Sequence, residues 1–146
     1  MSSSVNDAYA AIKTAVEATL TGKTELANPY EIENNPFGFL KEGYGIAYGP
    51  AREAPNVEFK ATWSLQSFDV HLTKETISLE SNPEPMRATV QALHSEALSV
   101  IKAVLDPNIY PSGILYAETS APTPIEAEKQ IISLTVTFVA RTQDTL

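Results

Sequence analysis

The first periodic pattern in the chain predicts an amphipathic helix over residues 5–20. At about 100° per residue, the apolar side chains of this segment fall on one side, and Asp7, Lys13 and Glu17 fall on the other. Ser4 precedes the pattern and Asp7 follows three residues later, which predicts a capping box. Gly22 is the expected end of the helix.

Alternating apolar positions predict two strands in the following part of the chain. A short alternation runs from Tyr44 to Tyr48 and ends at Gly49-Pro50, and a longer one runs over residues 57–72, after a polar connection. Within the longer run the parity of the apolar residues changes near Gln66-Ser67. One extra residue moves every later side chain to the opposite face, so this change predicts a β-bulge at that point.

A second helix is predicted from Asn82-Pro83-Glu84-Pro85, which has a capping side chain before a proline, to Asp106-Pro107. Its apolar stripe is about 100° wide, as in a helix packed on a sheet. Leu98 and Leu105 lie off this stripe, on a flank that a monomer would leave in water. We therefore expect these two leucines to contact another subunit. The stripe consists of Met86, Val90, Leu93, Ala97, Val100, Ile101 and Val104.

Two further strands are predicted, over residues 113–120 and 129–141, with a turn at 121–124 between them. The order is then helix, strand, strand, helix, strand, strand (α-β-β-α-β-β). Two hairpins and two helices predict an α+β fold, with a mostly antiparallel four-stranded sheet and both helices on one face. Residues 1–146 are expected to form a single domain, since 15.8 kDa is the size of one ordinary core.

The segment from Lys23 to Gly43 is expected to be a long irregular loop. Asn28-Pro29 and Asn34-Asn35-Pro36 interrupt any regular pattern, while several apolar residues argue against plain disorder. Ordering about twenty residues alone would cost roughly 1 to 2 kcal/mol each in backbone entropy. We therefore expect neighbouring subunits or another protein to order this loop.

Composition excludes several classes of protein. The chain has no cysteine and only two histidines, so neither a disulfide scaffold nor a structural zinc site is expected. Ten basic and eighteen acidic residues give a net charge of −8 and a pI near 4.7, which argues against a surface for nucleic-acid phosphates. The longest apolar stretch, residues 130–140, is too short for a spanning helix, and no targeting segment is recognisable. The expected place of synthesis is the cytoplasm.

No motif in the sequence predicts catalysis, a cofactor or a metal. Gly22-Lys23-Thr24 resembles the end of a phosphate-binding loop, but it follows a helix where the motif requires a strand. Asp69 and His71 share one face of a strand, and His94 borders the helical stripe; both histidines are interpreted as boundary residues. The acidic residues of the loops have no calcium-loop spacing, so solvated surface is expected for Glu31, Glu33, Glu118, Glu126 and Glu128. We therefore expect a protein that assembles with other subunits, and we do not expect an enzyme.

Three stretches give the chain a resemblance to a known family. They are Pro36 to Ala51, with its aromatic and glycine-rich strand; Phe68 to Lys74; and the closing pair Gly113-Ile114 and Ile132 to Val139. The chain resembles the phage tail terminator proteins, of the type of the lambda minor tail protein U. The resemblance covers nearly the whole chain in topology and about a third of it in recognisable pattern.

The resemblance implies a virion structural protein in the tail or neck. Such a protein forms a ring, most often a hexamer, that caps the head-proximal end of the tail tube, stops its growth and binds the neck or head-completion proteins. DNA passes through the ring without specific binding, which suits a net charge of −8. The expected contacts with other subunits or with the tube are made by Phe37, Phe39, Tyr44, Leu98 and Leu105.

Two alternatives remain open at this point. One is another neck or tail-completion subunit of the same fold, which the sequence does not distinguish from a terminator. The other is a small cytoplasmic enzyme or ligand-binding α+β domain, which would be a monomer or dimer with a polar pocket.

Overall fold

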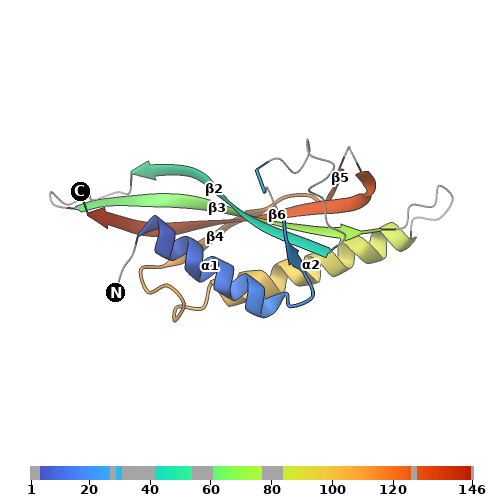
Figure 1. Cartoon of the computed structure of the whole chain (residues 1–146), viewed down its shortest axis with the longest axis horizontal. Coiled ribbons are helices and arrows are strands. Elements are labelled where there is room, and N and C mark those ends of the chain that lie inside the picture. Colours follow the sequence, from blue (N-terminus) through green and yellow to red (C-terminus); the bar gives the residue numbers. More distant parts are fainter. Residues whose placement is uncertain are drawn as a thin grey trace.

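Two helices and six strands make up the described part of the chain (Figure 1). The computed structural model describes residues 4–26, 29–30, 42–53, 61–76, 84–125 and 128–145. In chain order the elements are α1 (Val5–Thr19), β1 (Thr24–Glu25), β2 (Glu42–Glu53), β3 (Ala61–Glu75), α2 (Glu84–Val104), β4 (Ile114–Thr119), β5 (Thr123–Ile125) and β6 (Glu128–Thr145).

The sheet differs from the predicted one in strand number, order and direction. The prediction of a mostly antiparallel four-stranded sheet in the order α-β-β-α-β-β is wrong. The described residues form a six-stranded mixed sheet in the order α-β-β-β-α-β-β-β, and its one parallel pair joins β1 to β2. The two strands missed are β1, with two residues, and β5, with three, and neither is long enough to show an alternation. A turn or loop tip was expected at 121–124, but Thr123 and Pro124 of it belong to β5, and Pro124 is tolerated because this strand lies at an edge.

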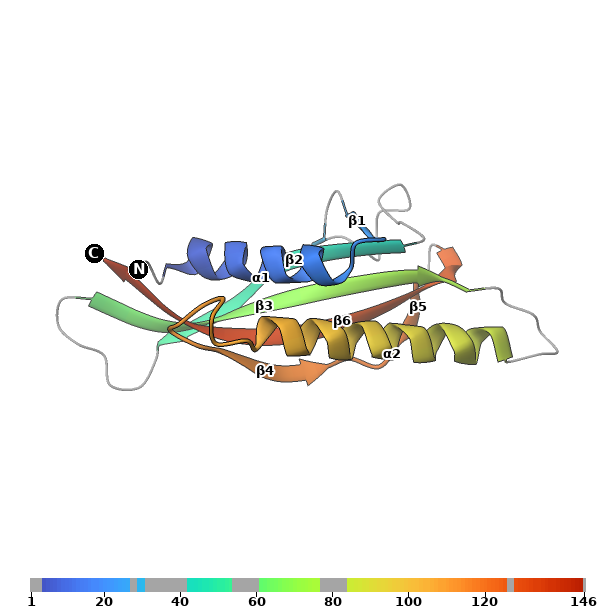
Figure 2. The same cartoon turned by 90° about the horizontal axis from the view of Figure 1, so that it is seen from below.

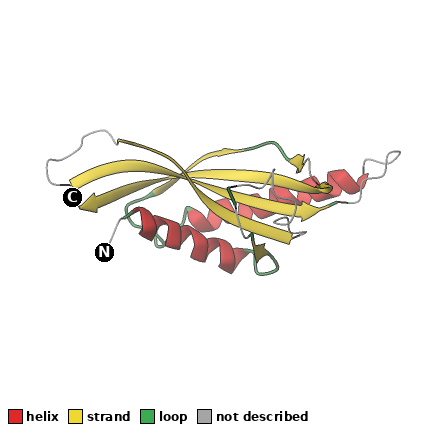
Figure 3. Cartoon of the chain, turned by 45° about the horizontal axis from the view of Figure 1, so that its top comes forward, coloured by secondary structure: helices red, strands yellow, loops and turns green. Residues whose placement is uncertain are grey.

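The longest strand, β6, lies inside the sheet, between β3 and the edge strands β4 and β5. On one side it pairs antiparallel with β3, from Ala61↔Thr145 to Glu75↔Ile131 without interruption. On its other side it pairs with β4 and β5, while β2 pairs with the far side of β3. The long strands cross one another in projection because the sheet is strongly twisted (Figure 3).

The predicted bulge near Gln66-Ser67 is also misplaced. The register between β2 and β3 shifts between Tyr48 and Ala51, opposite Phe68 and Gln66, so the extra residue belongs to β2. Strand β2 thus continues past Gly49-Pro50 to Glu53, where the sequence had predicted an end. The parity change in β3 has another cause: Gln66 occupies a helix-facing position, and its Nε2 donates a hydrogen bond to the Gly49 carbonyl at 2.7 Å.

Both helices pack on the same face of the sheet, side by side (Figures 1 and 2). The predicted capping box of α1 is confirmed: the Asp7 amide donates to Ser4 Oγ, and Asp7 Oδ2 accepts from the Ser4 amide, each at 3.2 Å. The last residue of the helix is Thr19 and Leu20 is its C-cap, close to the predicted end at residue 20 and two residues before Gly22. The core between helices and sheet contains Ile12, Val16, Phe68, Leu72, Leu93, Val100, Leu134, Val136 and Phe138, all fully buried.

The beginning of the expected loop is regular. Thr24 and Glu25 pair with Gly43 and Tyr44, and the buried Leu26 donates its amide to the Tyr44 carbonyl at 2.7 Å. The prediction of an irregular segment from Lys23 to Gly43 is therefore wrong for residues 23–26, and also for residues 42–43, which begin strand β2. Residues 27–28 and 31–41 of that segment lie outside the described residues.

Candidate functional site: an ionic clamp, exposed leucines and a groove

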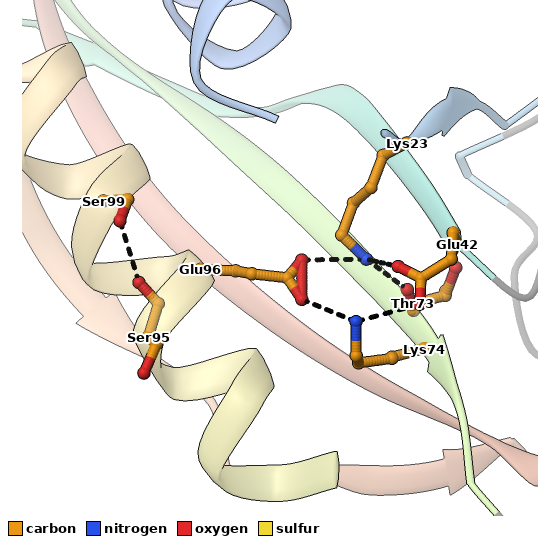
Figure 4. A network of polar contacts seen from close by, with 7 residues as sticks. All are labelled: Lys23, Glu42, Thr73, Lys74, Ser95, Glu96 and Ser99. Atoms are coloured by element: carbon orange, nitrogen blue, oxygen red, sulfur yellow. Dashed lines mark hydrogen bonds and ion pairs between the residues drawn. The ribbon is translucent and has the colours of Figure 1, made fainter. Parts of the chain in front are cut away.

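Four charged side chains from four parts of the fold meet beside the C-terminal end of α1 (Figure 4). Lys23 Nζ, beyond α1, lies 3.1 Å from Glu42 Oε2 of β2 and 3.0 Å from Glu96 Oε2 of α2. Lys74 Nζ of β3 lies 2.8 Å from Glu42 Oε1 and 3.2 Å from Glu96 Oε1. We call these four residues the ionic clamp. Each cation contacts both carboxylates, so the clamp joins α2 to the sheet and to the segment after α1.

Burial makes Lys23 the central member of the clamp. Its side chain is only 3% exposed, and Nζ also donates to the Thr73 carbonyl at 2.6 Å. A buried ammonium is tolerated only where its charge and its hydrogen bonds are matched, and here all three donors have an acceptor. Lys23 belongs to the Gly22-Lys23-Thr24 triplet that the sequence analysis considered as a phosphate-loop fragment.

In the clamp, burial and ion pairing shift the pKa values of Glu42 and Lys74 in opposite directions. Burial alone would raise the pKa of Glu42, but the hydrogen bonds from Lys74 and Lys23 outweigh it and lower that pKa below 4.5. Burial would likewise lower the pKa of Lys74, but its bonds to Glu42 and Glu96 raise it above 10.5. Two cations and two carboxylates leave the clamp with no net charge, and its contacts therefore serve cohesion of the fold.

The open face of the sheet, opposite the helices, carries a row of paired polar groups. Thr137 Oγ1 donates to Asp69 Oδ1 at 2.7 Å, and His71 Nδ1 lies 2.7 Å from Thr135 Oγ1. Burial lowers the pKa of His71, while Asp69 opposes that shift. Half-buried His71 matches the boundary position predicted for it, and His94 is exposed on α2. Among the described residues, no three His, Cys, Asp or Glu side chains gather as potential metal ligands.

The two leucines predicted to lie off the core stripe of α2 are indeed exposed. Leu98 is 66% exposed and Leu105 39% exposed, which confirms their position on the outer flank; their contact with another subunit stays a prediction. Sequence reasoning missed Leu115, which is 68% exposed, and Tyr116, both on edge strand β4. Ile114, Leu115 and Tyr116 are consecutive apolar residues, so alternation alone did not assign their faces.

The remaining expected contact residues are placed differently. Tyr44 is buried within the chain itself, and its hydroxyl donates to Glu17 Oε1 at 2.8 Å. Burial and then the neighbouring Glu17 raise the pKa of this tyrosine well above its ordinary value. It therefore retains little surface for another subunit. Phe37 and Phe39 lie outside the described residues.

A shallow groove of about 580 Å³ runs between α1 and the end of α2. From α1 it is bordered mainly by small side chains, and from the α2 end by Ala103, Asp106 and Ile109. The groove thus has an apolar floor with carboxylates at its border. Its α1 lining consists of Asp7, Ala10, Ala11, Thr14, Ala15, Ala18 and Thr19.

Comparisons with known proteins identify no family for the chain. No family model matches the chain, and no curated protein matches it. Among solved structures, a chain from the virion of a native gene transfer agent (GTA) particle is similar, with a TM-score of 0.48 and 12% identity, over 92% of this chain and 93% of that one. Within the described residues, neither helix is long and apolar enough to cross a membrane.

Proposed function

We propose that this protein is a structural subunit of a phage-type virion and forms a ring on the head-proximal end of a tail tube. The ring would end tube growth and join the tail to the neck. The proposal rests on the position, within the fold, of the segments that resemble tail terminators. Its described segments, in β2, β3, β6 and at the start of β4, are neighbouring strands of one sheet.

The pairing of these segments is direct. Tyr48 of β2 lies opposite Phe68 of β3, and Phe68 lies opposite Phe138 of β6. The three rings come from three separate stretches of the quoted pattern, yet they occupy one row across the sheet. The segments that resemble tail terminators are therefore parts of one sheet. This is what we expect if the chain and the tail terminators share a fold.

The exposed side chains of Leu98 and Leu105 support assembly. Full burial of a leucine side chain stabilises by about 1.5 to 3 kcal/mol, so leaving Leu98 and Leu105 in water forgoes much of that free energy. A contact between subunits would recover it. The partners proposed are further copies of the chain in a ring, most simply a hexamer, together with the tail tube protein and a neck or head-completion protein.

DNA is proposed to pass through the ring unbound, and the location is the tail or neck of the virion. The net charge of −8 per subunit would make the lumen repel phosphates and so prevent the passing DNA from adhering. The proposed role requires no catalysis.

The test has two measurements on the purified chain. Light scattering or native mass spectrometry should find a closed ring, and a tube-assembly reaction with the tail tube protein should give tubes of limited length only when the ring is present. A ring that forms but leaves tube length unchanged would contradict the terminator role and favour another neck subunit. A stable monomer that binds a small molecule would contradict the assembly proposal altogether.

A further inference from the structure

The outer flank of α2 presents two leucines with a lysine between them. Leu98 lies in α2, and Leu105 directly follows its last residue, Val104, with an amide that donates to the Ile101 carbonyl at 3.0 Å, so the helical spacing continues. The two leucines are seven residues apart, which is close to two helical turns and about 10.5 Å along the axis. Lys102 lies between them and is exposed. None of the ion pairs found among the described residues involves Lys102. We call Leu98, Lys102 and Leu105 the leucine flank.

The groove between the helices matches the leucine flank in the spacing of its side chains, and the charge at its border is opposite to that of Lys102. Ala11 and Ala18 of α1, both in its lining, are also seven residues apart, so the low points of its floor repeat at the same spacing of about 10.5 Å. Asp7 and Asp106 lie at its border. Side chains the size of leucine fit between alanines when two helices pack, and an ammonium beside them meets a carboxylate.

The two surfaces belong to different sides of α2. The groove contacts α2 at Ala103, and the clamp residue Glu96 also points to the α1 side. Leu98 is five residues before Ala103, which places its side chain about 140° away around the helix. A chain therefore cannot cover its own groove with its own leucines, whereas a neighbouring copy can.

We propose that the leucine flank of one copy packs into the groove of the next. Leu98 and Leu105 would lie over the alanines of α1, and Lys102 would face the carboxylate of Asp106 or Asp7. Two different surfaces meet in this contact, so it is heterologous and repeats head to tail, as a closed ring requires. The inference rests on the proposed ring and specifies how its subunits touch.

The first test compares two aspartate variants of equally exposed leucines. Leu98→Asp should weaken self-association at least about tenfold, because a charge without a partner would be desolvated against the alanine floor. Leu115→Asp is the matched control, since Leu115 has the same exposure but lies on β4. It should leave association within about threefold of the unmodified chain, that is within about 0.7 kcal/mol. Thermal unfolding of both variants checks that they fold.

The second test reverses the charges. Lys102→Glu and Asp106→Lys should each weaken association about tenfold or more, because like charges would then face each other across the contact. The double variant should recover most of the loss. Sedimentation velocity over a range of concentrations measures all of these chains together with the unmodified one.

The outcomes separate this inference from the proposed function. If the unmodified chain never assembles, the proposed ring is wrong. If it assembles while Leu98→Asp and Lys102→Glu behave like the unmodified chain, the ring stands and this contact is refuted. A stronger effect of Leu115→Asp than of Leu98→Asp would also overturn the contact, and would place the interface on β4.

Discussion

Removing the charge of Glu96 tests how much the clamp contributes to the free energy of unfolding, because Glu96 pairs with the buried Lys23. Glu96→Gln keeps the shape of the side chain, but it deprives two cations of a carboxylate, at 3.0 Å from Lys23 and 3.2 Å from Lys74. Breaking a fully buried ion pair costs about 3 to 5 kcal/mol, and breaking an exposed pair costs about 0 to 1 kcal/mol. Glu96 is 19% exposed, and Glu42 remains as a partner for both lysines.

The expected loss of unfolding free energy therefore lies between these limits, at about 1.5 to 3 kcal/mol, the range for hydrogen bonds to charged groups. Urea unfolding at neutral pH measures it, at one concentration below that at which copies associate, because assembly would add to the apparent stability. Glu25→Gln is the control: it removes an ion pair to Lys13 of similar length, 3.1 Å, but on the surface. Equal losses for Glu96→Gln and Glu25→Gln would refute the argument that the burial of Lys23 gives the clamp its strength.

Three further changes test the fold. Leu93→Ala, at a fully buried position of α2, should lower the unfolding free energy by about 2 to 4 kcal/mol through lost transfer energy and a cavity, as measured by urea unfolding. Gly45→Ala should cost about 1 to 3 kcal/mol, because its Cβ would lie 2.8 Å from Cβ of Pro29, whereas Gly22→Ala has open space and should melt near the unmodified chain. Because the folded pKa of Glu42 is lowered, its contribution is complete above pH 4.5 and is lost as the pH falls through the folded value. Unfolding measured from about pH 6 to about pH 3 should show a smaller decline for Glu42→Gln than for the unmodified chain.

The helices could be predicted because their patterns are long and local. α1 repeats over 15 residues and α2 over 21, and the Ser4 capping box is readable from residues three apart. The short strands could not be predicted in this way. β1 consists of two residues, and only its pairing with β2 makes it a strand.

The clamp was not predictable, because its members are distant in sequence. Lys23 lies 19 residues from Glu42 and 50 from Thr73, and nothing local indicates that these groups meet. The exposed flank of α2 was predictable, since the angular position of Leu98 and Leu105 follows from helical period alone. For Leu115 the period of two was masked by its apolar neighbours, so its exposure depends on the sheet as a whole.

The position of β6, between β3 and the edge strands β4 and β5, has a consequence for synthesis. Partners such as His71 and Thr135, or Ser64 and Thr142, are 64 and 78 residues apart, so the middle of the sheet closes only after nearly all the described strands have been made. Until residues 128–145 leave the ribosome, β3 has a free edge along its whole length, beside an apolar face that includes Phe68 and Leu72. Nascent chains halted before β6 should therefore bind chaperones or aggregate. Synthesis of this one strand pairs the free edge of β3 and so converts an aggregation-prone intermediate into a folded subunit.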